Sequence, residues 1–336
     1  DDVNGWNFYD NNNQLYDPAA SDWHGTGIAG IIAGGWNNGI GISGLVPKVK
    51  LLPVKYLGGT KGEAKTSGAI MAIEYAKKMG AKVINCSWGG PGYNAALEEV
   101  IVKSPDILFV CASGNDKLDT DRYPVYPACL NLPNTISVAA VNNTGVEAGF
   151  SNYGSKIDVA APGNYIYSTY PGNAFVYVNG TSFAAPYVSG VAALLRSYRP
   201  DITSEELKGS IKSSVKILSS LKQVVNTSGM VDAFGALRYA NNWGETPPSP
   251  IPTPVYSSTP VPTPYVPGIV GDVSGDGQVN STDYTLMKRY LLGIISDFPV
   301  EDDLWAADVN NDSLINSTDL TLMKRFLLGI ISKFPK

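Results

Sequence analysis

Short apolar runs alternate with segments of helical periodicity through the first two thirds of the chain. The apolar runs predict buried strands over residues 48–57, 81–89, 106–115 and 134–141, and residues 63–80 carry apolar side chains at helical spacing. Strands that alternate with helices form a parallel sheet that is covered by helices on both faces. The pattern therefore predicts an α/β fold, whose sites lie beyond the carboxyl ends of the strands.

A proline-rich segment interrupts this pattern at residues 245–267. Nine of its 23 residues are proline, and such a composition cannot build a core, so we expect an extended linker that reaches at most roughly 70 Å. The linker divides the chain into a large domain over residues 1–244 and a small domain over residues 268–336. A length of 336 residues fits this division, because it is long for a single core.

The small domain consists of a duplicated sequence. Residues 307–335 match residues 271–299 at 20 of 29 positions, so we expect both copies to fold alike. In each copy, oxygen-bearing side chains fall at loop positions 1, 3, 5, 9 and 12, and position 7 offers its backbone carbonyl, which is the EF-hand spacing of calcium ligands. These positions are Asp272, Ser274, Asp276, Gln278, Asn280 and Asp283 in the first copy, and Asp308, Asn310, Asp312, Leu314, Asn316 and Asp319 in the second. An acidic surface loop would explain one copy, whereas two copies in the same register favour calcium sites.

Charge, hydropathy and cysteine content argue against three classes of protein: nucleic-acid-binding, membrane-spanning and disulfide-rich proteins. The net charge is −5 and no run of lysine or arginine could follow a phosphate backbone, so we expect no nucleic-acid partner. No apolar run reaches the length of a membrane span. The three cysteines, Cys86, Cys111 and Cys129, are an odd number, which predicts buried free thiols rather than a disulfide framework.

Three polar residues in separate segments are candidates for nucleophilic catalysis. His24 is the only histidine of the chain and opens a helix-like run, Ser182 lies where a glycine-containing turn enters a helix, and Asn115 follows an apolar strand. Taken singly, each has a structural interpretation: a satisfied polar side chain, a helix cap and a turn residue. Taken together, they provide a nucleophile, its base and an oxyanion donor at a positive helix terminus. Such a donor stabilises a transition state by roughly 3–4 kcal/mol.

The segments around these residues resemble the motifs of the subtilisin-like serine proteases, the subtilases. Residues 24–30 read HGTGIAG, residues 180–186 read GTSFAAP, Asn115 follows CASG, and residues 85–90 read NCSWGG. The resemblance covers residues 1–240 and implies a secreted endopeptidase. In it Ser182 attacks the peptide carbonyl, His24 transfers the proton, and Asn115 with the Ser182 N–H binds the oxyanion. It also implies that two segments flank an extended protein or peptide substrate, namely Ser87, Trp88 and Gly89, and Ala112, Ser113 and Gly114.

The catalytic aspartate of that family has no clear counterpart in this sequence. In subtilases it lies upstream of the histidine, at the end of a buried strand. Here Asp1 and Asp2 precede VNGW, and Asp10 lies in FYDNNN, which resembles a polar loop. We expect that the sequence begins after the aspartate strand, and the alternative is that one of these three residues serves. Loss of the aspartate is expected to lower turnover on the order of 10⁴-fold, because the imidazole lacks its orienting partner.

The small domain resembles a type I dockerin, the module that attaches enzymes to the cohesins of a cellulosome scaffold. Each loop runs into one helix, STDYTLMKRYLLG or STDLTLMKRFLLG, and the resemblance implies a small all-α domain with two Ca²⁺ ions. It further implies a cohesin-facing surface that consists of Ser281, Thr282, Lys288 and Arg289 with Ser317, Thr318, Lys324 and Arg325. We therefore expect a secreted, cellulosome-associated protease. The alternatives are an inactive, subtilase-like peptide-binding module and a cargo domain whose main role is dockerin-mediated assembly.

Overall fold

The computed structural model describes most of the chain on both sides of the proline-rich segment. The described residues are 5–18, 22–58, 64–241, 269–274, 277–291, 295, 298, 306–310 and 315–335. The chain divides into two compact units, Asp1–Ser249 and Pro250–Lys336. Among the helices within the described ranges, none combines the length and the apolar character that a membrane span requires.

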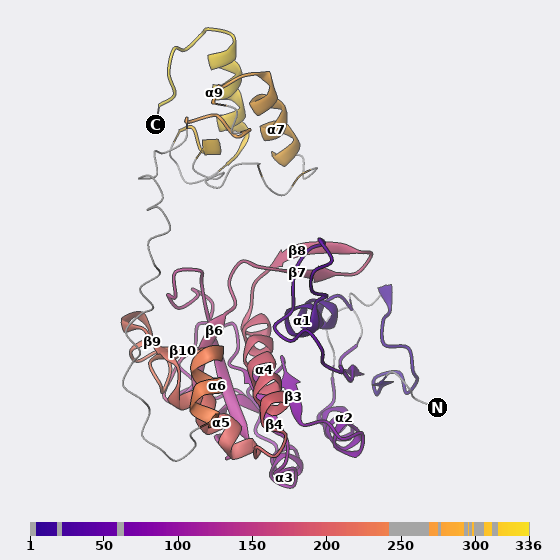
Figure 1. Ribbon diagram of the computed structural model, residues 1–336. Coiled ribbons are helices and arrows are strands. Elements are labelled where there is room, and N and C mark those ends of the chain that lie inside the picture. The colour runs from indigo at the N-terminus through magenta and orange to yellow at the C-terminus, as the bar shows by residue number, and fades with distance from the viewer. Residues whose placement is uncertain are drawn as a thin grey trace. The chain divides into compact units, whose positions relative to one another are not determined.

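A six-stranded, mostly parallel sheet forms the centre of the N-terminal unit, in the order β3-β4-β5-β6-β10-β9 (Figure 1). Neighbouring strands run parallel from β3 to β10, and β9 pairs antiparallel to β10 at the edge. The strands are β3 (Val83–Cys86), β4 (Leu108–Ala112), β5 (Thr135–Val141), β6 (Val159–Pro162), β9 (Lys216–Ile217) and β10 (Gly229–Met230). The register places Cys86 beside Cys111 and Ala112 beside Val138, so the carboxyl ends of β3 and β4 lie at one edge.

Helices cover both faces of this sheet. The helices of the unit are α1 (His24–Ala33), α2 (Thr66–Lys78), α3 (Ala95–Val102), α4 (Thr181–Tyr198), α5 (Ser204–Ser213) and α6 (Ala233–Asn241). Leu108 and Val110 of β4 pack with α4, α5 and α6, whereas Phe109 and Cys111 pack with α2 and α3. A strand buried on both faces is expected to be a continuous apolar run, as β4 is. The predicted parallel sheet with two helical layers is confirmed, and all three cysteines are buried and free, as expected.

Outside the central sheet, the strands differ from the prediction. Residues 48–57 contain only the two-residue strand β2 (Val54–Lys55), which pairs in parallel with β1 (Trp6–Asn7) and not with the central sheet. Pro53 immediately precedes β2, and proline, which lacks an N–H donor, shortens a strand. The segment before His24 therefore includes a strand where the sequence indicated only a polar loop.

An antiparallel hairpin that the sequence analysis did not predict lies over α1 (Figure 1). It consists of β7 (Ile166–Tyr170) and β8 (Ala174–Val178). The Ser168 hydroxyl donates to the Gly27 carbonyl (2.6 Å), and the Thr169 hydroxyl donates to the Thr26 carbonyl (2.7 Å). These two bonds fix the first turn of α1, which begins at His24.

The C-terminal unit is built around two equivalent helices, α7 (Ser281–Leu291) and α9 (Ser317–Leu327), where the duplicated sequence predicts them. Met287 and Met323 occupy the same position in the two copies, and both are fully buried in one core. Two ring stacks at equivalent positions have the same centroid separation of 4.7 Å, Tyr290–Phe298 and Phe326–Phe334. The repeated sequence thus makes repeated contacts in a small, mostly helical domain.

Candidate functional site

The carboxyl ends of β3 and β4 bring two of the catalytic candidates, Asn115 and Ser182, to one edge of the sheet. Ser87 follows β3 directly, and Asn115 lies three residues beyond β4. The Thr181 backbone N–H, at the start of α4, donates to Asn115 Oδ1 (2.8 Å) and ties the helix to the end of β4. Parallel sheets form their sites at this edge.

The N-terminus of α4 is held by Asn115 and not by a side chain of its own. Gly180 is the N-cap residue, with φ 148°, and the Thr181 hydroxyl also donates to Asn115 Oδ1 (3.0 Å). Because a backbone N–H can only donate, the Thr181 contact identifies Oδ1 and leaves Nδ2 as the donor group of the amide. A Cβ on Gly180 would lie 3.6 Å from Asn115 Nδ2 and 3.7 Å from the Ser182 nitrogen, so the glycine keeps the space beside both groups open.

Ser182 is the second residue of α4, and it is held against Ser87. The Ser182 hydroxyl donates to the Ser87 carbonyl (3.2 Å), and the Ser87 hydroxyl donates to the Ser182 carbonyl (2.6 Å). The Ser182 hydroxyl thus bonds to Ser87 and not to the backbone of α4, so the helix-cap interpretation is not supported. Asn85 Nδ2 donates to the Ser87 hydroxyl (2.8 Å), and the Ser189 hydroxyl donates to Asn85 Oδ1 (2.9 Å).

Sequence reasoning did not single out Asn85 and Ser189 as individual residues of this network. Asn85 does belong to the NCSWGG segment, and Ser189 lies seven residues after Ser182. Residues separated by seven positions share a helix face. The spacing was therefore visible in the sequence, but the pairing of α4 with β3 was not.

His24 begins α1, which packs against α4. Its ring lies edge-on to the rings of Trp23 (centroids 5.9 Å apart) and Phe183 (5.3 Å). Within the described ranges, no residue forms a hydrogen bond with the imidazole. Burial lowers the pKa of His24 below its usual 6.5, because the charged form is poorly solvated there. The imidazole is therefore neutral at pH 7 and able to accept a proton.

Two of the acidic side chains that precede His24 pair with a lysine. Lys55 Nζ lies 2.5 Å from Asp22 Oδ2 and 3.9 Å from Asp10 Oδ2. Asp10, one of the alternative partners for the imidazole, is thus part of an ion-pair cluster with β2. The other two alternatives, Asp1 and Asp2, lie outside the described residues.

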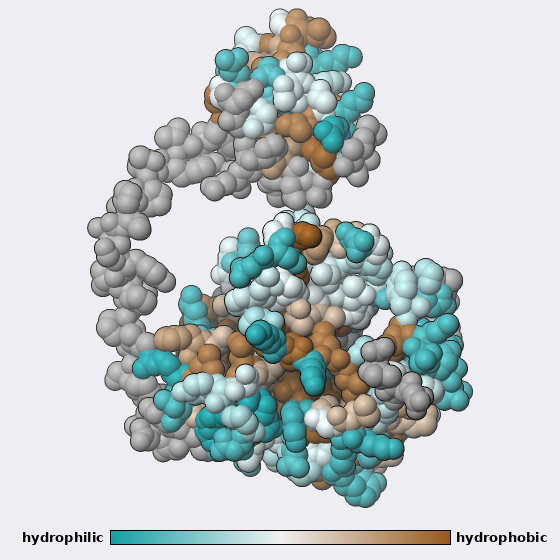
Figure 2. Space-filling view, turned by 45° about the vertical axis from the view of Figure 1, so that its right-hand side comes forward, coloured by the Kyte–Doolittle hydropathy of each residue, from teal (hydrophilic) through white to brown (hydrophobic). Residues whose placement is uncertain are grey.

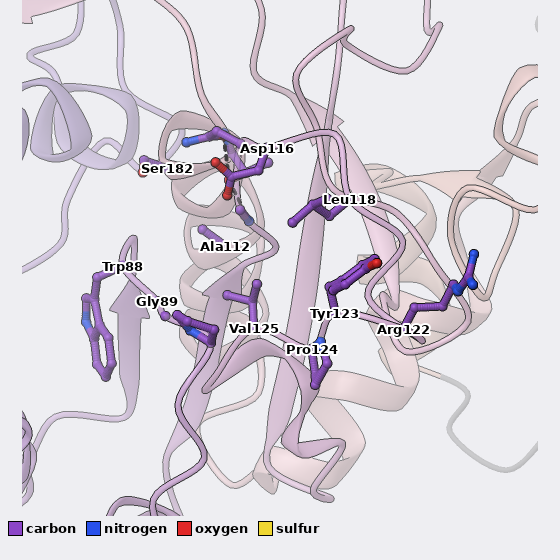
Figure 3. Close-up of a pocket in the computed structure, with 15 residues that line it drawn as sticks. Trp88, Gly89, Ala112, Asp116, Leu118, Arg122, Tyr123, Pro124, Val125 and Ser182 are labelled. Carbon is purple, nitrogen blue, oxygen red and sulfur yellow. Dashed lines mark hydrogen bonds between the residues drawn. The ribbon is translucent and has the colours of Figure 1, made fainter.

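A cavity of about 620 Å³ opens beside Ser182 (Figure 3). Both segments expected to flank the substrate contribute to its lining, which includes Trp88, Gly89, Ala112, Gly114, Asn115 and Val125. Asp116 lies near Ser182 at one end, whereas the Arg122 side chain points away from the serine (Figure 3). The cavity is therefore apolar along much of its wall and polar where it meets the serine.

The segment after β4 is braced from behind. Ser113 is fully buried; its N–H donates to the Val138 carbonyl (3.0 Å) and its own carbonyl accepts from Asn152 Nδ2 (3.0 Å). Gly114, with φ 105°, donates its N–H to the Thr181 hydroxyl (3.1 Å). Ser113 thus supports the wall from the protein interior, while the residues on either side of it border the cavity.

In the C-terminal unit, the predicted calcium loops contain buried carboxylates. Asp283 and Asp319, at the last position of each loop, are fully buried. Asp283 accepts the N–H groups of Ser274 (2.9 Å) and Asn280 (2.7 Å), and Asp319 accepts the N–H of Asn316 (2.9 Å). Buried carboxylates are unfavourable unless they bind cations or hydrogen-bond donors. An oxygen-rich, negatively charged donor set of this kind fits Ca²⁺.

Not every predicted ligand can be placed. Asp272 and Asp308, at the first position of each loop, are buried, whereas Asp276, Asp312 and Leu314 lie outside the described residues. The residues that are described contain no group of three acidic, histidine or cysteine side chains positioned to hold a metal. Of the other predicted ligand positions, Ser274, Asn280, Asn310 and Asn316 are half-buried and Gln278 is exposed.

The surface that the dockerin resemblance assigns to cohesin is open to solvent. All eight of its residues are exposed on α7 and α9, namely Ser281, Thr282, Lys288, Arg289, Ser317, Thr318, Lys324 and Arg325. The two copies therefore present the same polar pattern.

Comparisons with known proteins identify the family of each unit. The subtilase family model matches residues 1–236, and the type I dockerin model matches residues 270–328. Thermitase from Thermoactinomyces vulgaris is 36% identical over 239 residues, which cover 70% of this chain and 81% of thermitase. Subtilisin Savinase from Lederbergia lenta is 36% identical over 217 residues, 64% of this chain and 77% of that protein. A solved protease of Pseudoalteromonas arctica has a TM-score of 0.58 at 32% identity, covering 65% of this chain and 70% of its own. The chain therefore belongs to the subtilase family of serine proteases, and its C-terminal unit carries a type I dockerin domain.

Proposed function

We propose that the N-terminal unit is a serine endopeptidase, with Ser182 as nucleophile, His24 as general base, and Asn115 with the Ser182 N–H as oxyanion donors. The observation that carries the proposal is the tie between β4 and α4. Asn115 Oδ1 accepts from Thr181, which leaves Asn115 Nδ2 beside the space that Gly180 keeps open. The Ser182 N–H borders the same space at the positive end of α4. A peptide carbonyl bound there would lie next to the serine hydroxyl.

We propose that the proton is transferred between Ser182 and His24 in two stages. The Ser182 hydroxyl first exchanges its 3.2 Å bond to the Ser87 carbonyl for one to the neutral imidazole. Oγ then bonds to the substrate carbonyl carbon, the imidazole takes the proton, and the carbonyl electron pair moves to the oxyanion. When the intermediate collapses, the C–N bond breaks and His24 gives the proton to the leaving amine. Water repeats these steps, releases the acid and restores Ser182.

We assign the aspartate of a Ser-His-Asp mechanism to no residue that the structure describes, because none of them forms a hydrogen bond with His24. Asp10 and Asp22 pair with Lys55 instead. We assign part of the orientation of the imidazole to the rings of Trp23 and Phe183, which contact it edge-on. An orienting carboxylate would add to this packing, because it also stabilises the imidazolium that forms during the reaction.

We assign the cavity to a substrate side chain next to the cleaved bond. Ala112 and Gly114 form its wall on one side, and Trp88 and Gly89 line it on the other. A Cβ on residue 89 would lie 2.8 Å from Val125 Cγ1, so only glycine fits at this position of the cavity wall. The apolar wall favours an apolar substrate side chain.

The second candidate function is a peptide-binding module that does not cleave its ligand. It is favoured by one observation, namely that His24 has no hydrogen-bonded partner among the residues described. Both candidates use the same groove, so peptide affinity does not distinguish them. Cleavage does, because it requires His24 to act as a base.

For the C-terminal unit we propose two Ca²⁺ sites and calcium-dependent docking to a cohesin. Type I dockerin domains generally bind calcium, and the buried carboxylates of the two loops supply the oxygen donors. Binding would fold the loops around the ions and present the exposed Ser-Thr and Lys-Arg pairs of α7 and α9 to the partner. Such docking would place the protease in an extracellular, cellulosome-associated assembly.

Two assays test these proposals. The chain should cleave a chromogenic peptide only slowly, because no described residue takes the place of the triad aspartate. Ser182→Ala should reduce this cleavage to background while it leaves the melting temperature unchanged. Peptide binding without Ser182-dependent cleavage would support the second candidate instead. In a pull-down, an immobilised type I cohesin should retain the chain in Ca²⁺ and release it in EDTA. Equal retention in EDTA would contradict the calcium-dependent interface.

A further inference from the structure

Four aromatic rings form a continuous row on the β7–β8 hairpin, which we call the aromatic ladder. Its members, in spatial order, are Phe175, Tyr167, Tyr177 and Tyr165. The centroids of successive rings are 5.8, 4.9 and 4.8 Å apart, with interplanar angles between 31° and 42°. Tyr167 and Tyr177 lie directly opposite each other across the hairpin. The neighbouring rings restrict one another, which lowers the entropy that a ladder ring loses on binding a ligand.

The ladder faces away from the protein core. Tyr165, Tyr167 and Tyr177 are 61%, 37% and 40% exposed. Ile166, which alternates with them along β7, is buried in a core cluster. The hairpin therefore attaches to the protein by one face and presents rings and phenolic hydroxyls on the other.

A second segment extends the ladder. Gly41, with φ 59°, packs so closely on the Phe175 ring that a Cβ at this position would overlap it. The loop around Gly41 carries Trp36, which is 48% exposed, and Ile40, which is 63% exposed. Two distant segments that expose apolar and aromatic side chains thus meet where Gly41 packs on Phe175. Contiguous patches of this kind on a soluble protein mark binding surfaces.

Both segments that form the patch are uncharged. Residues 25–47 and 159–195 contain no Asp, Glu, Lys, Arg or His, although the chain as a whole has 25 basic and 30 acidic residues. In Figure 2 the upper part of the N-terminal unit, where Figure 1 places the hairpin, has a broad pale area of intermediate hydropathy. A surface without fixed charge offers little to an acidic or basic partner and does not penalise a neutral one.

We propose that the aromatic ladder and the Trp36 loop bind a neutral polysaccharide. Sugar rings carry apolar C–H faces and equatorial hydroxyls. A site for such a ligand needs aromatic rings that stack on the C–H faces, and neutral donors and acceptors nearby that bond to the hydroxyls. The ladder supplies the aromatic groups, and the hydroxyls of Tyr165 and Tyr167 supply polar ones. A protein partner would match the aromatic rings but would ordinarily add charged pairs at the rim of the interface. The inference does not depend on Ser182 being a nucleophile, because the two sites share no residue.

Retention of the full-length chain on microcrystalline cellulose and its migration in gels that contain hydroxyethyl cellulose test this proposal. Tyr167→Ala/Tyr177→Ala removes the centre of the ladder and should weaken binding by about tenfold or more. Tyr165→Ala, at the most exposed position, should weaken it less and carries a smaller risk to the hairpin. The matched control is Tyr198→Ala, since Tyr198 is 57% exposed at the end of α4. The control should bind like the native chain.

Several outcomes would overturn the proposal. The proposal would be wrong if the native chain bound neither glucan. It would also be wrong if the double variant and Tyr165→Ala both bound as tightly as the control. Loss of native binding on raising the salt concentration would indicate an ionic surface elsewhere, because binding through the ladder involves no charged group. Concentration-dependent sedimentation that disappears in the double variant would identify the patch as a contact between two copies of the chain.

Discussion

Substitution of Asn115 separates the two roles that the structure gives to this amide. Its Oδ1 accepts two hydrogen bonds from Thr181, and its Nδ2 borders the proposed oxyanion space. Asn115→Asp keeps an acceptor for Thr181 and removes the donor. Asn115→Ala removes both. The pair therefore distinguishes stabilisation of the helix from stabilisation of the transition state.

The expected magnitudes follow from burial. Thr181 is fully buried, so loss of its acceptor in Asn115→Ala should lower the free energy of unfolding by about 1–3 kcal/mol. Asn115 itself is exposed, so an aspartate there stays solvated, and its charge is favourable at a helix N-terminus. Asn115→Asp should therefore change stability by less than about 1 kcal/mol. Both variants lose the Nδ2 donor and should lower kcat by about 10²- to 10³-fold.

Urea unfolding and peptide-cleavage kinetics, measured on the same preparations, check both effects. The matched reference is Ser182→Ala, which defines the background rate. The reasoning would be refuted if Asn115→Asp retained kcat within about threefold of the native value, because the amide would then not be an oxyanion donor. Equal destabilisation by both variants would show that the Thr181 contact does not stabilise α4.

Three further predictions address other parts of the molecule. Burial lowers the pKa of His24 below 6.5, so the rate of cleavage should be independent of pH around neutrality and fall only below pH 6.5. NMR titration of this single imidazole checks the pKa, and a rate that already falls above pH 7 would contradict the prediction. Asn85→Ala removes a hydrogen bond to the Ser87 hydroxyl, which in turn bonds to Ser182. It should lower kcat about fivefold and leave KM nearly unchanged. An equal rise in KM would indicate a general structural role for Asn85. Asp283→Ala and Asp319→Ala should each abolish one of two Ca²⁺ equivalents in a calorimetric titration of the full chain, and a variant that still binds two ions would contradict the ligand assignment.

The layers of the fold were visible in the sequence because they depend on local patterns. β4 is buried on both faces, and its residues form an unbroken apolar run, which distinguishes a central parallel strand from an edge strand. The two helices of the C-terminal unit follow loops of fixed spacing, so a duplicated sequence located both. In each case a single segment contains the whole signal.

The hairpin and the serine network lacked such a signal. The β7–β8 hairpin turns Ile166 and Val178 inward, but it presents tyrosines to solvent on its other face, so the alternation of apolar and polar side chains that marks a strand is weak in its sequence. The bonds from Ser87 to Ser182 connect residues 95 positions apart, and that from Ser189 to Asn85 spans 104. Contacts of this range are set by how α4 packs on β3, which no local pattern determines.

The helix N-terminus at Ser182 shows the same limit. Locally, Thr181 and Ser182 are suitable capping residues. In the folded chain the acceptor comes from Asn115, 66 residues earlier, and the hydroxyl of Ser182 turns toward Ser87 instead. A local preference was thus overridden by a contact that serves the candidate site.

The rate and position of fluorophosphonate labelling test the proposed catalytic centre most directly. The native chain should form one adduct, which peptide mapping places on Ser182, and His24→Gln should slow its formation by at least about 10²-fold, because the base that activates the hydroxyl is lost. An adduct on another residue, or a labelling rate in His24→Gln equal to that of the native chain, would contradict the assignment of Ser182 and His24 as nucleophile and base.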